Sequence, residues 1–293
     1  MQVFDTIAAM RRQLSEWRRA GQHIAFVPTM GNLHAGHIAL IRHAATLADH
    51  VVTSIYVNPM QFNDANDLAR YPVTLEEDRQ RLQAVATDIL YLPDAGQIYP
   101  YGLADSVRVS VPGLSDVLEG VFRPGHFTGV TTVVAKLLNI VQPDIAVFGE
   151  KDWQQLLLIR RMVADLLMPV QIVAVATERE ADGLAMSSRN GGLNESERCQ
   201  AAGIYQVLST LRDRWQRQRL VGKCDYRLLE HEAMAELERQ GLRVEYVSIR
   251  NGEDLTEPVM GEARTGKQSA EAPLVVLAAV WLGETRLIDN LPL

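Results

Sequence analysis

The sequence predicts an α/β protein in which a doubly wound parallel sheet is followed by a smaller C-terminal α+β domain with an antiparallel sheet. In the first part of the chain, short apolar runs alternate with segments of helical periodicity. Nearly continuous apolarity, as in Val51–Val57, is typical of strands covered on both faces and joined by right-handed crossovers. The pattern changes near Glu178. We therefore expect one domain over residues 1–178 and another over 179–293.

Five short apolar runs are the candidate strands of the parallel sheet, and helices fit between them. The runs are His23–Val27, Val51–Val57, Asp88–Leu92, Ile145–Phe148 and Val170–Ala176. Helical spacing after three of the loops predicts helices that begin near Ile38, at Val130 and at Trp153.

The second domain is predicted to contain two helices and three strands. Asn194 and Glu197 form the pattern of a capping box, which opens a helix through Leu211 and as far as Arg219. A second helix is expected over Tyr226–Gln240. The strands follow, with Gly283-Glu284 as the turn between the last two: Arg243–Ile249, Leu274–Leu282 and Arg286–Asp289. Residues 261–273, rich in small and charged side chains, are expected to form a mobile insertion.

Composition bounds the function. The chain has 293 residues, 47% of them hydrophobic, and a formal net charge of −7 without a long basic run, which disfavours binding to tRNA or DNA. Cys199 and Cys224 have no neighbouring thiol or histidine at metal-ligand spacing, so we expect free thiols in a reducing compartment. The N-terminus does not resemble a secretion signal, and no apolar stretch approaches the ~18 residues of a membrane span. A soluble cytoplasmic protein without a membrane or nucleic-acid partner is expected.

The stretch Pro28–His37, Pro-Thr-Met-Gly-Asn-Leu-His-Ala-Gly-His, joins a buried-strand pattern to the start of a helix. Unpaired N–H groups at a helix N-terminus attract phosphate oxygens, and Gly31 and Gly36 let the backbone approach an anion closely. His34 and His37 stand three residues apart, so on a helix both rings would share one face. A pair of surface or metal-binding histidines is the alternative. The strand, the glycines and the helix start favour a nucleotide triphosphate site.

A second loop is expected at the same edge, because doubly wound sheets bind ligands beyond the carboxyl ends of their strands. Gly149-Glu-Lys-Asp152 follows a predicted strand and brings Lys151, a flexible cation that suits phosphate oxygens. Asp152 suits either ribose hydroxyls or a helix cap. One turn further on, Gln155 presents an amide that both donates and accepts hydrogen bonds.

A third loop, Asn58-Pro-Met-Gln-Phe62, follows the second long strand. Gln61 is a natural partner for a hydroxy acid at this edge of the sheet. Asn58 fits a ligand contact and a turn that satisfies the local backbone equally well.

Three other polar segments leave two interpretations open. Glu76-Glu77-Asp78 suits a hydrated magnesium ion or, as the favoured interpretation, a solvated helix face. Arg123–Gly129 is either a glycine-hinged loop whose two cations contact a carboxylate or phosphate, or a surface loop. Asp182–Asn190 carries hydroxyls, a glycine and Arg189 between the two domains, as expected of a linker that closes over departing pyrophosphate.

Four segments resemble, in order and spacing, the motifs of the pantoate–β-alanine ligase (pantothenate synthetase) family, which belongs to the cytidylyltransferase-like nucleotide-binding superfamily. The segments are Pro28–His37, Tyr56–Phe62, Phe148–Asp152 and Asp182–Asn190. The resemblance implies a homodimer whose chains carry a Rossmann-like ATP- and pantoate-binding domain over residues 1–178 and a smaller C-terminal lid domain over 179–293.

The same resemblance implies the roles of individual residues. His37 is the implied proton donor, and His34, Lys151 and Arg189 are implied to share the catalytic work. Pantoate is implied to bind Gln61 and Gln155, and β-alanine to bind Gln61. The residues implied to bind ATP are Met30, Gly31, Asn32, Leu33, His34, Ala35, Gly36, His37, Gly149, Glu150, Lys151, Asp152, Glu178, Met186, Ser187, Ser188 and Arg189. Relatives usually have a small apolar residue at the position of Glu178, where the backbone meets adenine, so its side chain is expected to turn away.

The implied reaction is the ATP-dependent condensation of pantoate with β-alanine to pantothenate. Pantoate's carboxylate attacks the α-phosphorus, pyrophosphate leaves, and the amine of β-alanine displaces AMP from pantoyl adenylate. Positioned cations, helix N–H groups and Mg²⁺ bridging the phosphates stabilise the growing charge, with no side chain assigned to the metal. A nucleotidylyltransferase acting on a phosphorylated acceptor and a nucleotide-sensing binding module are the alternatives. Lys151 and Arg189 beside the histidines favour an enzyme over the binding module.

Overall fold

The computed structural model of the chain describes residues 1–220, 224–258 and 273–293, which form two compact units. The first unit comprises residues 1–150 and 154–177, and the second comprises residues 151–153 and 178–293. The predicted insertion lies outside the described residues, apart from Pro273.

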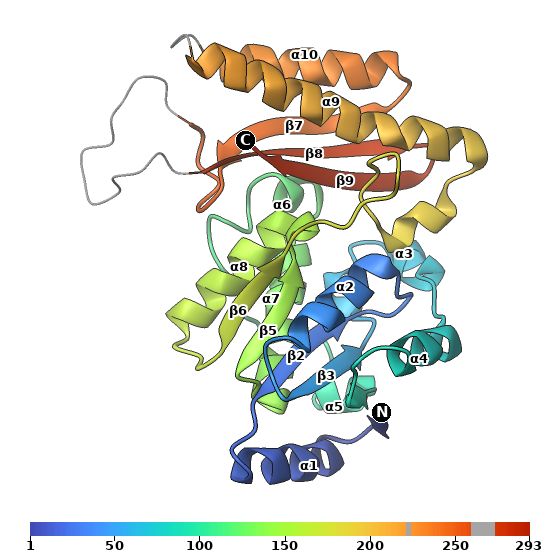
Figure 1. Cartoon of the computed structure of the whole chain (residues 1–293), viewed down its shortest axis with the longest axis vertical. Coiled ribbons are helices and arrows are strands. Elements are labelled where there is room, and N and C mark those ends of the chain that lie inside the picture. Colours follow the sequence, from blue (N-terminus) through green and yellow to red (C-terminus); the bar gives the residue numbers. More distant parts are fainter. Residues whose placement is uncertain (221–223, 259–272) are drawn as a thin grey trace. The chain divides into compact units, whose positions relative to one another are not determined.

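A six-stranded sheet with the strand order β1-β4-β3-β2-β5-β6 forms the first unit (Figure 1). Every neighbouring pair of strands is parallel, which confirms the predicted doubly wound sheet and its five strands. The sequence does not predict β1, because three residues at a sheet edge are too few to show a period. The strands are β1 Gln2–Phe4, β2 Ile24–Thr29, β3 His50–Ile55, β4 Ile89–Tyr91, β5 Ile145–Gly149 and β6 Gln171–Val175.

Alternate residues of the central strands point into two separate cores, one on each face of the sheet. In β2, Phe26 packs into one core, whereas Ala25 and Val27 pack into the other. The Phe26 core is covered by α1 (Ile7–Arg19), α7 (His126–Val141) and α8 (Trp153–Asp165). The opposite core is covered by α2 (Ala35–Ala44) and α4 (Leu75–Gln83). The sheet is therefore buried on both sides, as the continuous apolar runs predict. The remaining short elements of this unit are 3₁₀ turns over Pro59–Gln61 and Glu150–Asp152 and the helices α3 Ala65–Arg70, α5 Ala95–Ile98 and α6 Glu119–Phe122.

The second unit is a three-stranded antiparallel sheet, ordered β7-β8-β9, packed against two helices (Figure 1). The predicted capping box is confirmed, because Asn194 Oδ1 accepts the Glu197 N–H at 2.9 Å and Glu197 Oε2 accepts the Asn194 N–H at 3.0 Å. The predicted turn at Gly283-Glu284 joins β8 to β9. The elements are a 3₁₀ turn over Ser188–Gly192, α9 Glu195–Leu220, α10 Tyr226–Arg239, β7 Arg243–Asn251, β8 Leu274–Leu282 and β9 Thr285–Pro292. In the described part of the chain, no helix combines the length and apolarity needed to cross a membrane.

Candidate active site

The strand order places three of the predicted loops side by side. β3, β2 and β5 are consecutive neighbours and run parallel, so the loops that follow them leave the sheet at one edge. The order reverses direction between β2 and β5, which is the switch point where doubly wound sheets bind ligands. The histidine-containing loop follows β2, and Gly149 ends β5.

The loop after β2 has an unusual backbone that depends on Gly31 and Asn32. Both residues are left-handed, with φ of 82° and 49°. A Cβ at Gly31 would lie 3.0 Å from the Ile55 side chain and 3.1 Å from Asp78, so glycine is needed here for space as well as for φ. Asparagine tolerates the left-handed region better than most residues, which suits it to the next position.

Asp78 holds the backbone of this loop through hydrogen bonds. The favoured interpretation of a solvated helix face is wrong for Asp78, because its side chain is buried, with 1% of the residue exposed. Its two carboxylate oxygens accept the N–H groups of Asn32 at 2.8 Å and Leu33 at 2.7 Å. From the next turn of α4, Arg81 donates to the Leu33 carbonyl oxygen. A signal was present in the sequence, since the spacing of Asp78 with Leu82 puts both on one helix face.

His34 and His37 meet in a way that differs from the predicted shared helix face. His34 is the N-cap of α2, with φ −125° and ψ 177°, so it lies outside the helix. Its Nδ1 accepts the Gly36 N–H at 3.2 Å, and His37 Nδ1 accepts the His34 N–H at 3.3 Å. The ring centroids are 4.1 Å apart. The N–H groups of His34 and Gly36 at this helix start are therefore bonded to imidazole side chains.

These bonds assign the tautomers of both rings. An Nδ1 that accepts a backbone N–H carries no proton, so the neutral imidazole holds its proton on Nε2. Each ring thus presents an Nε2–H donor, the group that a phosphate oxygen requires.

Gln61 is brought to the histidine-containing loop by the turn after β3. Its side chain is buried, and its Nε2 donates to the sulfur of Met30 at 3.1 Å. Asn58 satisfies the local backbone, which is one of the two interpretations left open by the sequence. Its Oδ1 accepts the local Met60 N–H, and its Nδ2 donates to Gln61 Oε1 at 3.0 Å.

The predicted loop Arg123–Gly129 is partly helical, because α7 begins at His126 rather than at Val130. Gly125 supplies the left-handed residue before the helix, with φ of 80°. His126 Nδ1 donates to the Gln61 carbonyl oxygen at 2.7 Å, and Arg123 lies 3.1 Å from His126 Nε2. Gly129, inside the helix, gives the Gln61 turn room to pack. Arg123 Nη2 also donates to the Gln61 carbonyl oxygen, at 3.5 Å, so in this structure both side chains hold the backbone of Gln61.

The segment after β5 divides between the two compact units. Lys151 and Asp152 belong to the second unit, where Asn290 Nδ2 donates to the Lys151 carbonyl oxygen at 2.8 Å. The Lys151 ammonium lies 3.9 Å from the Asp152 carboxylate. Gln155 belongs to the first unit and is half-buried on α8. Its neighbour Gln154 is buried and donates to two backbone carbonyl oxygens.

Two residues of β9 connect the polar segments of the second unit. Asp289 accepts both arms of the Arg179 guanidinium, at 2.7 and 2.9 Å, in a buried pair next to the Asn290 that holds Lys151. Glu178 is exposed, and its carbonyl oxygen accepts the Met186 N–H at 3.0 Å. Ser187 caps the following turn by accepting the Arg189 N–H at 3.2 Å.

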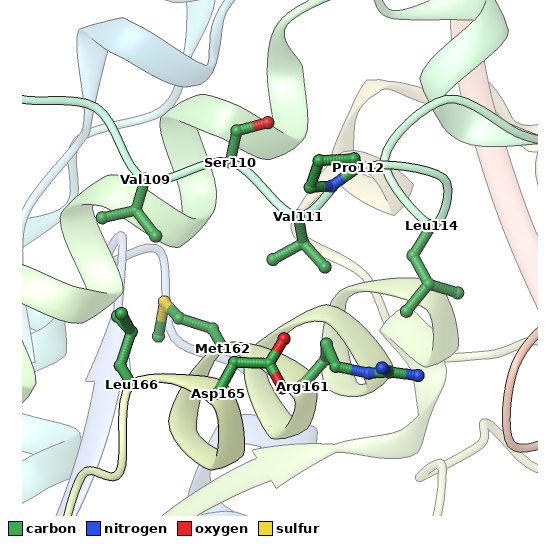
Figure 2. Close-up of a pocket in the computed structure, with 9 residues that line it drawn as sticks. All are labelled: Val109, Ser110, Val111, Pro112, Leu114, Arg161, Met162, Asp165 and Leu166. Carbon is green, nitrogen blue, oxygen red and sulfur yellow. The ribbon is translucent and has the colours of Figure 1, made fainter.

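A pocket of about 210 Å³ lies between residues 109–114 and the last turns of α8 (Figure 2). No predicted site residue lines it. α8 leaves the carboxyl end of β5 and returns to the amino end of β6, so its last turns approach the opposite edge of the sheet from the loops described above. The candidate site is therefore the loop edge of the sheet rather than this pocket.

Nearly all of the given sequence matches known proteins. A sequence model of the family described as Pantoate-beta-alanine ligase matches residues 2–292. The chain belongs to the pantoate–β-alanine ligase family. It is 50% identical to the pantothenate synthetase of Thioalkalivibrio sulfidiphilus over 100% of this chain and 98% of the relative. Identity with the pantothenate synthetase of Nitrosococcus oceani is 49%, over 99% of this chain and 97% of the relative.

Solved structures of the pantoate–β-alanine ligase family have a fold similar to that of this chain. The crystal structure of pantothenate synthetase from Thermus thermophilus has a TM-score of 0.85 and 40% identity, over 99% of each chain. The pantoate-β-alanine ligase of Francisella tularensis, solved with Beta-gamma ATP and β-alanine, has a TM-score of 0.78 and 33% identity, over 100% of this chain and 97% of its own. The resemblance drawn from the sequence motifs is confirmed, and the chain is an enzyme of this ligase family.

Proposed function

We propose that this family member condenses pantoate with β-alanine in an ATP-dependent reaction that releases AMP and pyrophosphate. The observation that carries the proposal is the loop from Met30 to His37. Its backbone is clamped by Asp78, it presents two Nε2–H donors at a helix start, and it contacts Gln61. The relative from Francisella tularensis, solved with Beta-gamma ATP and β-alanine, supports ATP and β-alanine as ligands.

The residue roles implied by the sequence motifs are part of this proposal. ATP is assigned to Met30–His37, to Gly149–Asp152, to the backbone of Glu178 and to Met186–Arg189, with His37 as proton donor. Pantoate is assigned to Gln61 and Gln155, and β-alanine to Gln61, in the same unit as the histidines.

The proposed reaction proceeds in two steps. A carboxylate oxygen of pantoate bonds to the α-phosphorus, and the bond from that phosphorus to the pyrophosphate oxygen breaks. The nitrogen of β-alanine then bonds to the acyl carbon, the bond to AMP breaks, and the nitrogen loses a proton. No protein nucleophile is required. The protein aligns two anions that repel each other and donates hydrogen bonds to phosphate oxygens as charge moves onto them.

We propose that Mg²⁺ arrives with ATP as part of the substrate. In the described ranges no three histidine, cysteine or acidic side chains group as metal ligands. Asp78, the buried carboxylate nearest the histidine-containing loop, uses both oxygens for backbone N–H groups. Phosphate oxygens are then the natural ligands of the ion, as is usual for Mg²⁺.

Isotope exchange tests the order of the two steps. We expect labelled pyrophosphate to exchange into ATP when pantoate and Mg²⁺ are present and β-alanine is absent. Lys151→Ala and Arg189→Ala should each lower the exchange rate about tenfold, because their cations act on the phosphates before the amine arrives. Exchange that requires β-alanine would exclude a free-standing adenylate step. A nucleotidylyltransferase would exchange without dependence on pantoate, and a binding module would not exchange at all.

We also propose that the enzyme is a cytoplasmic homodimer. Cys199 is exposed and Cys224 is half-buried, and both are free thiols, which suits a reducing compartment. Mostly apolar side chains line a shallow groove between α8 and β6, among them Leu167, which is 87% exposed. This surface suits a second copy of the chain.

Light scattering tests the dimer. We expect Leu167→Glu to convert it to a monomer, because a buried carboxylate at the contact is strongly unfavourable. Leu220→Glu is the matched control, since Leu220 is also 87% exposed but lies at the end of α9 in the second unit. A Leu167→Glu dimer as stable as that of the control would place the contact elsewhere.

A further inference from the structure

A buried chain of hydrogen bonds leads from Tyr99 through Asn58 to Gln61. The Tyr99 hydroxyl donates to Asn58 Oδ1 at 2.5 Å, and Asn58 Nδ2 donates to Gln61 Oε1 at 3.0 Å. The three residues are 4%, 0% and 8% exposed. Tyr99 comes 41 residues after Asn58 in the sequence, and no sequence motif includes it.

The orientation of the Asn58 amide is fixed by two groups that each have only one role. The Gly129 carbonyl oxygen can only accept, and it lies 3.1 Å from Asn58 Nδ2. The Met60 N–H can only donate, and it faces Asn58 Oδ1 at 3.4 Å. The end of the amide that faces Tyr99 is therefore the oxygen. Because an amide oxygen only accepts, the Tyr99 hydroxyl must donate.

Asn58 in turn orients the Gln61 amide. Asn58 presents an NH₂ group to it, so the Gln61 atom that faces Asn58 is the oxygen. The other end of the Gln61 amide is then its NH₂ group, whose present acceptor is the thioether of Met30. A thioether is a weak acceptor, so a ligand oxygen would replace it readily.

The surroundings of Tyr99 keep it neutral and in place. Burial is the main cause that raises the pKa of Tyr99 above its ordinary value, and the neighbouring Tyr56 is the second. The phenol therefore remains a donor throughout the physiological range. The Lys136 ammonium lies 4.4 Å from the centre of the ring and donates to the Ile98 carbonyl oxygen at 2.8 Å. A cation over the ring polarises the phenol and strengthens its O–H as a donor.

We propose that Tyr99 is a positioning residue for the hydroxy acid, because its hydroxyl holds in place the Asn58 amide that orients Gln61. Since Asn58 offers its NH₂ group to Gln61, Gln61 presents its own NH₂ donor to the substrate, and this part of the site selects a ligand that offers an oxygen acceptor. Tyr99 itself touches no substrate. The proposal rests on the assignment of pantoate to Gln61.

The first test compares two tyrosine variants in steady-state AMP formation. Tyr99→Phe keeps the ring and removes the donor, and it is expected to raise the KM for pantoate about tenfold with the KM for ATP unchanged. Tyr56→Phe is the matched control. Its ring centre lies 6.5 Å from that of Tyr99, it is also buried, and its hydroxyl has no hydrogen-bond partner among the described residues. A purely structural role of Tyr99 would move both KM values or neither.

A second test separates Tyr99 from Gln61. If Tyr99 acts through Gln61, Tyr99→Phe should change the KM for pantoate little in a Gln61→Ala background. Gln61→Glu would hold one oxygen against Asn58 and turn the other toward the anionic substrate, so it should raise that KM more than Gln61→Ala does. A Gln61→Glu enzyme with a near-normal KM would overturn the proposed amide polarity.

The outcomes distinguish this proposal from the assignment on which it rests. If Gln61→Ala leaves the KM for pantoate unchanged, the assignment of pantoate to Gln61 fails. If Gln61→Ala raises it but Tyr99→Phe matches Tyr56→Phe, the assignment stands and the role of Tyr99 is overturned.

Discussion

His37→Ala is expected to lower the rate of AMP formation about a hundredfold while the chain stays folded. Loss of one donor that stabilises charge in a transition state typically costs ~3 kcal/mol. The ring also accepts the His34 N–H at the start of α2, so stability should fall by about 1 kcal/mol, as for a lost helix cap. AMP release and thermal unfolding measure the two effects.

Two further variants make this result specific. His43→Ala removes an imidazole from the last turn of the same helix and should leave the rate near normal. His37→Asn offers an oxygen to the His34 N–H but does not supply the imidazole, so it should restore stability without restoring the rate. Near-normal turnover of His37→Ala would remove His37 from the chemistry.

Asp78→Asn is expected to impair both stability and ATP binding. The amide leaves one accepting oxygen, so an NH₂ group must face the backbone N–H of Asn32 or Leu33. A buried donor without an acceptor lowers the free energy of unfolding by about 2 kcal/mol. A displaced loop should raise the KM for ATP about tenfold. Urea unfolding and the ATP dependence of the rate measure the two effects.

Glu77→Gln is the control for Asp78→Asn, because it removes a charge one residue away on the same helix. Glu77 is exposed and lies 3.6 Å from Arg81 in a solvent-accessible pair, which contributes little. If Asp78→Asn changes the stability and the KM for ATP no more than Glu77→Gln does, the hydrogen bonds from Asp78 to the histidine-containing loop have no function.

Local pattern was enough to predict the elements that carry the site. The apolar run before Pro28 and the helical spacing from Ile38 place a strand, a loop and a helix in that order, and the structure contains β2, the loop and α2. Parallel pairing then follows from the alternation of strands and helices. The capping box at Asn194 was equally readable, because its partners stand three residues apart.

Contacts between segments that are distant in the sequence could not be predicted from local pattern. Asp78 meets the backbone of Asn32 across 46 residues, and His126 meets the backbone of Gln61 across 65. In the sequence these residues belonged to an acidic helix face and a cationic loop. Their actual partners are backbone groups that packing has removed from water, and such groups must be satisfied by whichever polar side chain lies nearest.

The sequence by itself determined the family, the parallel sheet and the loops that carry the histidines, the lysine and the glutamines. Tertiary structure alone decided what those side chains do: the tautomers of His34 and His37, the direction of the Gln61 amide, and the burial of Asp78. The physical reason is that strands and helices follow from periods of a few residues along the chain. Whether a buried amide or imidazole atom donates or accepts is set by neighbouring groups that can only donate or only accept. Folding brings these groups together from anywhere in the sequence.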